Sequence, residues 1–188
     1  MKSYRLLLLI IGLLCAGKPV YAQVHTKIIS GQLLIDDGSP LLKQASYKPL
    51  TDSLDRALKT RPNDTTSLFY RALLYDQFNN LLAKPFATDN GALLNLTKAK
   101  DLCEQAISLK MNDFKLKVLR AQIYRDLTYR YSGDESWKFN TNQIAERRSK
   151  FNTYKELAKQ YYDELAALDK NNAYDYQKLK VTNQYPVK

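Results

Sequence analysis

The chain has 188 residues, of which 45% are hydrophobic and 26% charged, and its formal net charge is +10. The positive charges are scattered, with Arg147-Arg148 as the longest uninterrupted pair, whereas nucleic-acid-binding proteins usually cluster such charge along one face. The composition therefore argues against a nucleic-acid partner. It indicates solvated helix faces and leaves open a weak attraction to an anionic envelope surface or acidic polymer.

The first residues have the three parts of a secretory signal peptide. Lys2 and Arg5 precede an apolar run over residues 6–14, and a small-x-small exit, Val20-Tyr21-Ala22, follows. The run is too short to cross a bilayer, which needs about 20 apolar residues. We therefore expect residues 1–22 to be removed by cleavage after Ala22 and the protein to be exported, periplasmic or secreted. A buried N-terminal helix is the alternative.

The expected mature chain, residues 23–188, has 166 residues, a suitable length for one domain, and a net charge of +7. A lipid anchor on Cys15 is not expected, because Leu14 stands where lipoprotein signals carry a small residue. Cys103 is then the only cysteine, so the monomer has no internal disulfide and its stability must come from an apolar core.

Residues 23–48 predict a poorly structured N-terminal lead-in, with room for a short strand or a turn of helix. Their apolar residues lie before a strong turn signal, Asp36-Asp37-Gly38-Ser39-Pro40. No segment after residue 40 has the pattern of a strand.

From Pro49 onward, apolar residues recur at three- and four-residue steps, which predicts helices. Pro62 ends the first helix, and residues 63–66 offer side-chain oxygens that cap the second. Residues 80–95 predict a loop or a distorted insertion. The expected helices run from Pro49 to Pro62, from residue 66 to about 79, and over residues 96–110, 115–131, 142–168 and 174–183.

An internal repeat is visible. Ala57-Leu58-x-x-Arg61-x-Asn63-Asp64 recurs as Ala106-Ile107-x-x-Lys110-x-Asn112-Asp113, and Arg71-Ala72-x-x-Tyr75 recurs as Arg120-Ala121-x-x-Tyr124. Both pairs are separated by 49 residues. A fainter third copy runs from Ala158 to Asn172.

This spacing resembles the tetratricopeptide repeat family. Ala57 followed by Pro62, and Ala72 followed by Tyr75, fit its pattern of small and aromatic residues, and the resemblance covers residues 50–183. It implies an all-α domain over residues 49–188, built from two to three degenerate antiparallel helix hairpins. The family repeats every 34 residues, so the 49-residue shift requires insertions. An irregular helical bundle of separate origin is the alternative.

The resemblance also implies a peptide groove lined by the first helix of each pair. Mapped onto this chain, the groove residues are Phe69, Leu73, Asp76, Gln77, Lys115, Val118, Gln122 and Arg125. This mixture suits an extended peptide with a carboxylate, which an arginine can hold through two hydrogen bonds. Ordinary surface positions on a two-repeat scaffold are the alternative. So few repeats favour either self-association or a short groove.

The sequence contains no pattern for catalysis, a metal or a cofactor. His25 stands alone in the lead-in, and Cys103 lies on an apolar helix stripe where thiols are unreactive. Of the chain's 14 tyrosines, most recur at helical spacing and are expected in the core. Trp137 and Phe139 lie in a turn and form a candidate exposed aromatic site. The sequence thus predicts a non-catalytic protein–protein adaptor of the cell envelope, or alternatively a module that binds carbohydrate or anionic polymer.

Overall fold

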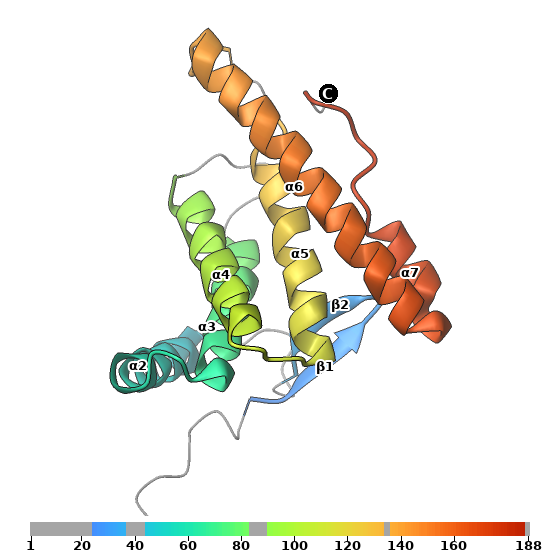
Figure 1. Ribbon diagram of the computed structural model, residues 1–188. Helices are drawn as coiled ribbons and strands as arrows, with labels where there is room; N and C mark the ends of the chain where they lie inside the picture. The colour runs from blue at the N-terminus through green and yellow to red at the C-terminus, as the bar shows by residue number, and fades with distance from the viewer. Residues whose placement is uncertain (1–23, 37–43, 83–89, 134–135, 187–188) are drawn as a thin grey trace, which may run out of the picture.

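The computed structural model describes residues 24–36, 44–82, 90–133 and 136–186. The expected signal peptide lies outside these residues. The chain is mostly helical, with one small sheet (Figure 1). The elements are β1 (Thr26–Ile29), β2 (Gln32–Ile35), α2 (Gln44–Thr60), α3 (Thr65–Leu82), α4 (Asn90–Ser108), α5 (Phe114–Arg130), α6 (Thr141–Leu168), a 3₁₀ turn at Lys170–Asn172 and α7 (Ala173–Lys178). No described helix has the length and apolar character needed to cross a membrane.

Consecutive helices pack against one another and bury one main core. The closest packing joins α3 with α4 and α5 with α6, while α4 also contacts α5. Of the apolar stripe predicted for α4, Ala99, Cys103 and Ala106 are at most 1% exposed, and Leu102, Ile107 and Leu109 pack partly buried against the same core. Small residues in such a stripe allow two helix backbones to approach closely, which is the packing that the sequence pattern predicts.

Local signals fix the ends of the central helices. Lys110 has a positive φ of 67°, and the amides of Lys110 and Met111 bond back to Ile107 and Ala106, which is a Schellman arrangement that ends α4. The Asp113 carboxylate then accepts from the Lys115 amide and caps α5. At the start of α6, Asn140 and Gln143 form a reciprocal capping box.

The N-terminal strands form an antiparallel hairpin, with Ile28 opposite Leu33. Its two-residue turn has φ of 48° at Ser30 and 75° at Gly31, the type I′ geometry that matches the twist of the strands. Ile28, Leu33 and Ile35 face inward and pack on the main helical core. Residues 24–36 are therefore an ordered hairpin rather than the poorly structured lead-in that we expected.

Three helix boundaries also differ from the sequence prediction. Helix α2 begins at Gln44 rather than at Pro49, so Pro49 is its sixth residue, beyond the first turn in which a proline removes no helical hydrogen bond. Helix α4 begins at Asn90, within the loop expected over residues 80–95, because Ala92 and Leu96 continue its buried stripe. Helix α7 ends at Lys178, five residues before the expected Asn183.

Helices α2 and α3 are joined by an Arg–carboxylate–Tyr cluster. The Arg71 guanidinium donates to both carboxylate oxygens of Asp55, at 2.6 and 3.2 Å, and to the Tyr75 hydroxyl at 2.9 Å. It also lies over the Tyr75 ring, 3.9 Å from the centroid. The arrangement joins the middle of α2 to the first half of α3.

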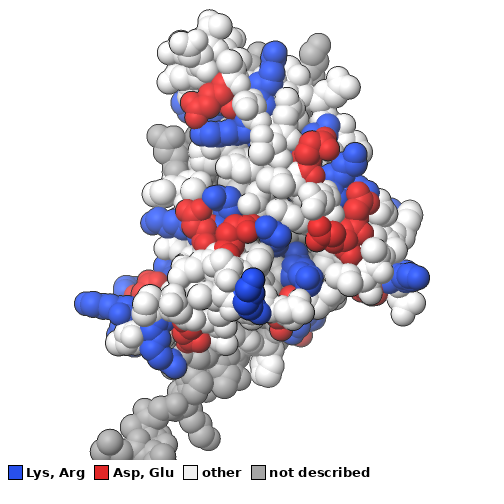
Figure 2. Space-filling model, in the orientation of Figure 1, with Lys and Arg blue, Asp and Glu red and all other residues white. Residues whose placement is uncertain are grey.

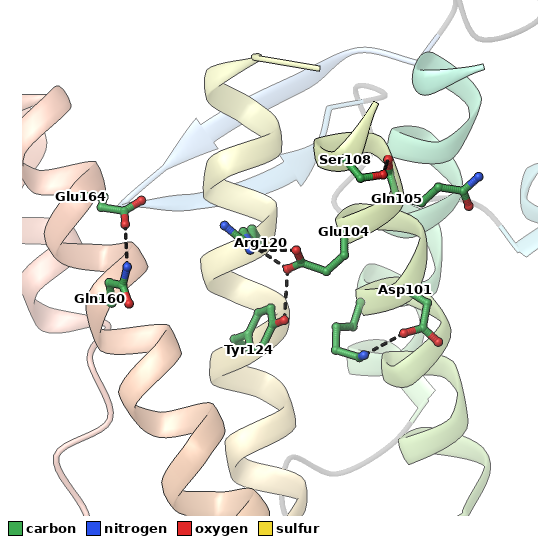
Figure 3. Close-up of polar contacts among 9 residues, drawn as sticks. Asp101, Glu104, Gln105, Ser108, Arg120, Tyr124, Gln160 and Glu164 are labelled. Carbon is green, nitrogen blue, oxygen red and sulfur yellow. Dashed lines mark hydrogen bonds and ion pairs between the residues drawn. The ribbon is translucent and has the colours of Figure 1, made fainter. Parts of the chain in front are cut away.

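A cluster of the same residue types recurs 49 residues later, between α4 and α5. Arg120 donates to both Glu104 oxygens at 2.7 Å, and the Tyr124 hydroxyl donates to Glu104 at 3.0 Å (Figure 3). The Arg–carboxylate pair therefore follows the 49-residue shift, whereas the tyrosine contacts differ, since Tyr75 accepts from Arg71 and Tyr124 donates to Glu104.

Candidate functional site

The eight predicted groove residues lie on α3 and α5, on the side that the β-hairpin covers. Five of them are buried with at most 4% exposure: Phe69, Leu73, Asp76, Val118 and Gln122. The other three, Gln77, Lys115 and Arg125, are half-buried. These positions are therefore not ordinary surface, and the face is not an open groove. In Figure 1 the blue hairpin lies behind α5, beside α7.

Two glutamines hold the backbone of Leu33 from both sides. The Leu33 amide donates to Gln122 Oε1 at 3.1 Å, and Gln77 Nε2 donates to the Leu33 carbonyl at 2.9 Å. The Leu33 side chain is 0% exposed and belongs to the core that contains Phe69 and Leu73. We call the two glutamines and the pocket for this leucine the Leu33 clamp. The clamp satisfies outward-facing main-chain groups of β2, which an edge strand otherwise exposes.

Two further predicted residues bind other parts of the hairpin. Lys115 Nζ donates to the carbonyl and hydroxyl oxygens of Thr26, both at 2.9 Å. Arg125 donates from both terminal nitrogens to Gln32 Oε1, at 3.3 Å, and from Nε to Asp126 at 2.8 Å. Arg125 is thus engaged within the chain rather than directed at an incoming carboxylate.

A buried acid supports the Leu33 clamp from behind. Gln122 Nε2 donates to Asp76 Oδ2 at 2.6 Å, which fixes the orientation of the amide so that its oxygen faces Leu33. Burial raises the pKa of Asp76 well above its usual range, and the charge of Asp126 raises it further, against the opposing effects of Gln122 and Arg125. Among the described residues, Asp76 Oδ1 has no hydrogen-bond partner. The acid therefore acts as a positioning group for Gln122.

The tyrosine behind this network has a similar environment. Burial raises the pKa of Tyr162, and its hydroxyl has no hydrogen-bond partner in the described part of the chain. Burial lowers the pKa of Arg125, but Asp126, Tyr162 and Asp76 together raise it by more, so Arg125 stays charged. The inner face of α3 and α5 thus contains amides, one acid and one ion pair as well as apolar residues.

The second candidate site is at the turn before α6. Trp137 is 84% exposed, more than any other large hydrophobic residue whose exposure the structure describes. Phe139 is half-buried, and the Arg147 guanidinium lies 4.5 Å from its ring centroid. Only Trp137 therefore offers an open aromatic surface at this turn. On the face drawn in Figure 2, basic and acidic side chains are interspersed, without one extended patch of a single sign.

The described residues offer no group of three or more His, Cys, Asp or Glu side chains suited to a metal ion. His25 is exposed in the residues before β1, and Cys103 is buried, where burial raises the pKa of its thiol. The contacts that the described residues of this face make with the hairpin are hydrogen bonds and apolar packing.

Sequence reasoning located the helix face but missed Leu33, the residue that it holds. The missed signal is the pair of apolar runs on either side of Ser30-Gly31, since two β-type runs around a two-residue turn predict a hairpin. No family model, curated protein or solved structure matches the chain.

Proposed function

We propose that this protein is a non-catalytic scaffold of the cell envelope, built from degenerate tetratricopeptide-like helix pairs, that binds protein partners through extended segments. The observation that carries the proposal is the Leu33 clamp. Gln77 and Gln122 bind both main-chain groups of one residue, and a buried pocket takes its side chain. Main-chain bonds combined with a side-chain pocket are the means by which proteins recognise extended peptides.

Export as a periplasmic or secreted protein is part of the same proposal and rests on the signal-peptide pattern of residues 1–22. The recurrence of the Arg–carboxylate–Tyr cluster after 49 residues supports the repeat. Self-association remains within this proposal, because a second copy is one source of a protein segment.

Capture of a partner by in-cell cross-linking tests the proposal. The tagged chain is cross-linked in the envelope of its own source, beside a Gln77→Ala/Lys115→Glu variant. The matched control is Lys159→Glu, a charge reversal at an exposed position of α6. We expect one defined protein to be captured by the wild type and the control and to be lost from the double variant. A partner captured equally by all three, or no partner, overturns the use of this face.

An alternative function is binding of a carbohydrate or anionic polymer at the turn around Trp137. The 84% exposure of that ring favours it, because exposed aromatic rings stack on sugars, and Lys138 adds a positive charge beside it. Titration with an anionic polysaccharide tests this alternative. Saturable binding that is lost in Trp137→Ala supports it, and the absence of binding excludes it.

A further inference from the structure

The hairpin is bound to the helices much as a peptide ligand is bound to a receptor. Among its bonds to the helices are three at main-chain atoms: the amide and carbonyl of Leu33 and the carbonyl of Thr26. Because every residue except proline carries both groups, these three bonds do not depend on which side chains the bound segment has. Selection for side chains comes from the pocket for Leu33, from the bonds of Lys115 to the Thr26 hydroxyl and of Arg125 to Gln32, and from Gly31, where a side chain would clash with Leu179.

The hairpin contributes little buried surface of its own. Of residues 24–36, only Gly31 and Leu33 are buried, while Lys27 and Ile29 are exposed. The two strands pair with each other alone, and a single two-stranded hairpin is marginal without a supporting surface. Its place in the fold therefore depends on the helix face.

The helix–helix contacts do not pass through the hairpin. Helices α3 and α4, and α5 and α6, pack directly on each other. A cavity of about 350 Å³ also remains between Gln32 on the hairpin and the residues of α5 and α7 beside it. Release of the hairpin would therefore expose the α3–α5 face and leave the contacts between the helices in place.

We propose that the β1–β2 hairpin is an exchangeable occupant of the α3–α5 face, which releases it to bind an extended segment of a protein partner. The segment carries a leucine at the Leu33 position and a second apolar residue two positions later, where Ile35 faces the same side. This inference rests on the proposed protein-binding function and specifies the partner's chemistry. The hairpin occupies the α3–α5 face in the absence of that partner. It also weakens the apparent affinity for the partner, because a tethered segment competes at a high effective concentration.

The test converts the tethered hairpin into a separate peptide. A protease site is inserted within residues 37–43 of the full chain, the purified protein is cleaved, and a labelled peptide of residues 24–36 is added. Anisotropy then reports its exchange into the face. Three unlabelled competitors are compared: the same peptide, its Leu33→Ala variant, and its Leu34→Ala variant. Leu34 is the matched control because it faces the opposite side of the hairpin from Leu33.

We expect the labelled peptide to exchange and the Leu33→Ala peptide to compete at least about thirtyfold more weakly, as for truncation of a fully buried leucine. The Leu34→Ala peptide should compete within about threefold of the parent. A peptide with serine at the exposed positions of Lys27 and Ile29 should still displace the label, because the bonds to the helices come from other residues.

Three results would overturn the proposal. In the first, the cleaved protein stays folded but does not exchange the labelled peptide. In the second, the cleaved protein loses its helical circular dichroism. Either result would mean that the hairpin is a fixed part of the core. In the third, the intact chain forms a dimer that dissociates in the Leu33→Ala variant, which would mean that the segment bound at the α3–α5 face comes from a second copy rather than from another protein. A partner captured in the cross-linking experiment would survive the first two results, so the two proposals fail separately.

Discussion

Replacement of Gln122 by leucine removes the centre of the network that holds the hairpin. The Gln122 side chain is 2% exposed, and leucine has nearly its volume, so the change removes polar contacts without opening a cavity. Two buried groups lose their partners: the Leu33 amide, at 3.1 Å, and Asp76 Oδ2, at 2.6 Å. Each costs about 1–3 kcal/mol when left unsatisfied, so we expect the free energy of unfolding to fall by about 2–6 kcal/mol.

A double variant separates the two losses. In Asp76→Leu/Gln122→Leu the acid is absent, so only the Leu33 amide is left without a partner. We expect this variant to regain about 1–3 kcal/mol relative to Gln122→Leu alone, which is a non-additive result of the kind that contacting residues give. Urea unfolding followed by circular dichroism measures all four species of the cycle.

Gln160→Leu is the control, because Gln160 is exposed on α6, and it should change stability by no more than about 0.5 kcal/mol. The reasoning is refuted if Gln122→Leu costs no more than this control. It is also refuted if the double variant equals the sum of the two single variants, since Asp76 would then not depend on Gln122.

Four shorter predictions follow from the same structure. Asp76→Asn should become more stable relative to the wild type as pH rises above about 4. Burial raises the pKa of Asp76 in the folded protein above its ordinary 3.8. The acid of the wild type therefore contributes fully to the free energy of unfolding below pH 3.8, and this contribution is lost as pH rises through the folded-state pKa. Glu104→Gln should cost only about 1 kcal/mol and less at high salt, because Glu104 and Arg120 are 31% and 26% exposed. Cys103 should react with a thiol reagent only on unfolding, because it is buried and burial raises the pKa of its thiol. Trp137→Ala should change stability by less than about 0.5 kcal/mol, because the ring is 84% exposed.

Each of these has a contrary result. Unfolding measured in urea between about pH 4 and pH 8 would contradict the first if the difference between Asp76→Asn and wild type stayed constant. A loss above about 3 kcal/mol for Glu104→Gln would mean that the cluster behaves as a fully buried ion pair. Reaction of Cys103 in the native state would place its thiol at the surface, and a marked loss in Trp137→Ala would mean that the ring packs on the fold.

The helices could be predicted from the sequence because the patterns that define them lie within each helix and its caps. Apolar residues at three- and four-residue steps define the faces of α5 and α6, and Asp113 and Asn140 cap them as such residues usually do. The errors fall where one local signal was given too much weight. Pro49, which was expected to start the first helix, lies inside α2, and Gly91, which was expected in a loop, lies inside α4.

Only the helical part of the candidate site could be predicted from the sequence. The 49-residue repeat aligns equivalent faces of α3 and α5, which is why Gln77 and Gln122 appeared together in the predicted groove. The residue that they hold is 89 positions away from Gln122 in the chain. The spacing of apolar residues along a helix does not indicate which distant residue packs against it. The turn at Ser30-Gly31 could have been predicted from the sequence, but the helix face on which the hairpin packs could not.

The polar content of the inner helix face is best understood through the hairpin that lies on it. Buried amides and acids are costly where helices pack on helices, because each must find a partner away from water. An extended segment brings unpaired main-chain groups of its own, and Gln77 and Gln122 satisfy those of Leu33. A face of leucine and alanine would pack α3 against α5 equally well but would leave the Leu33 amide and carbonyl buried without partners. The glutamines are therefore explained by an extended segment at this face, and the exchange of a cleaved hairpin decides whether that segment is always the chain's own.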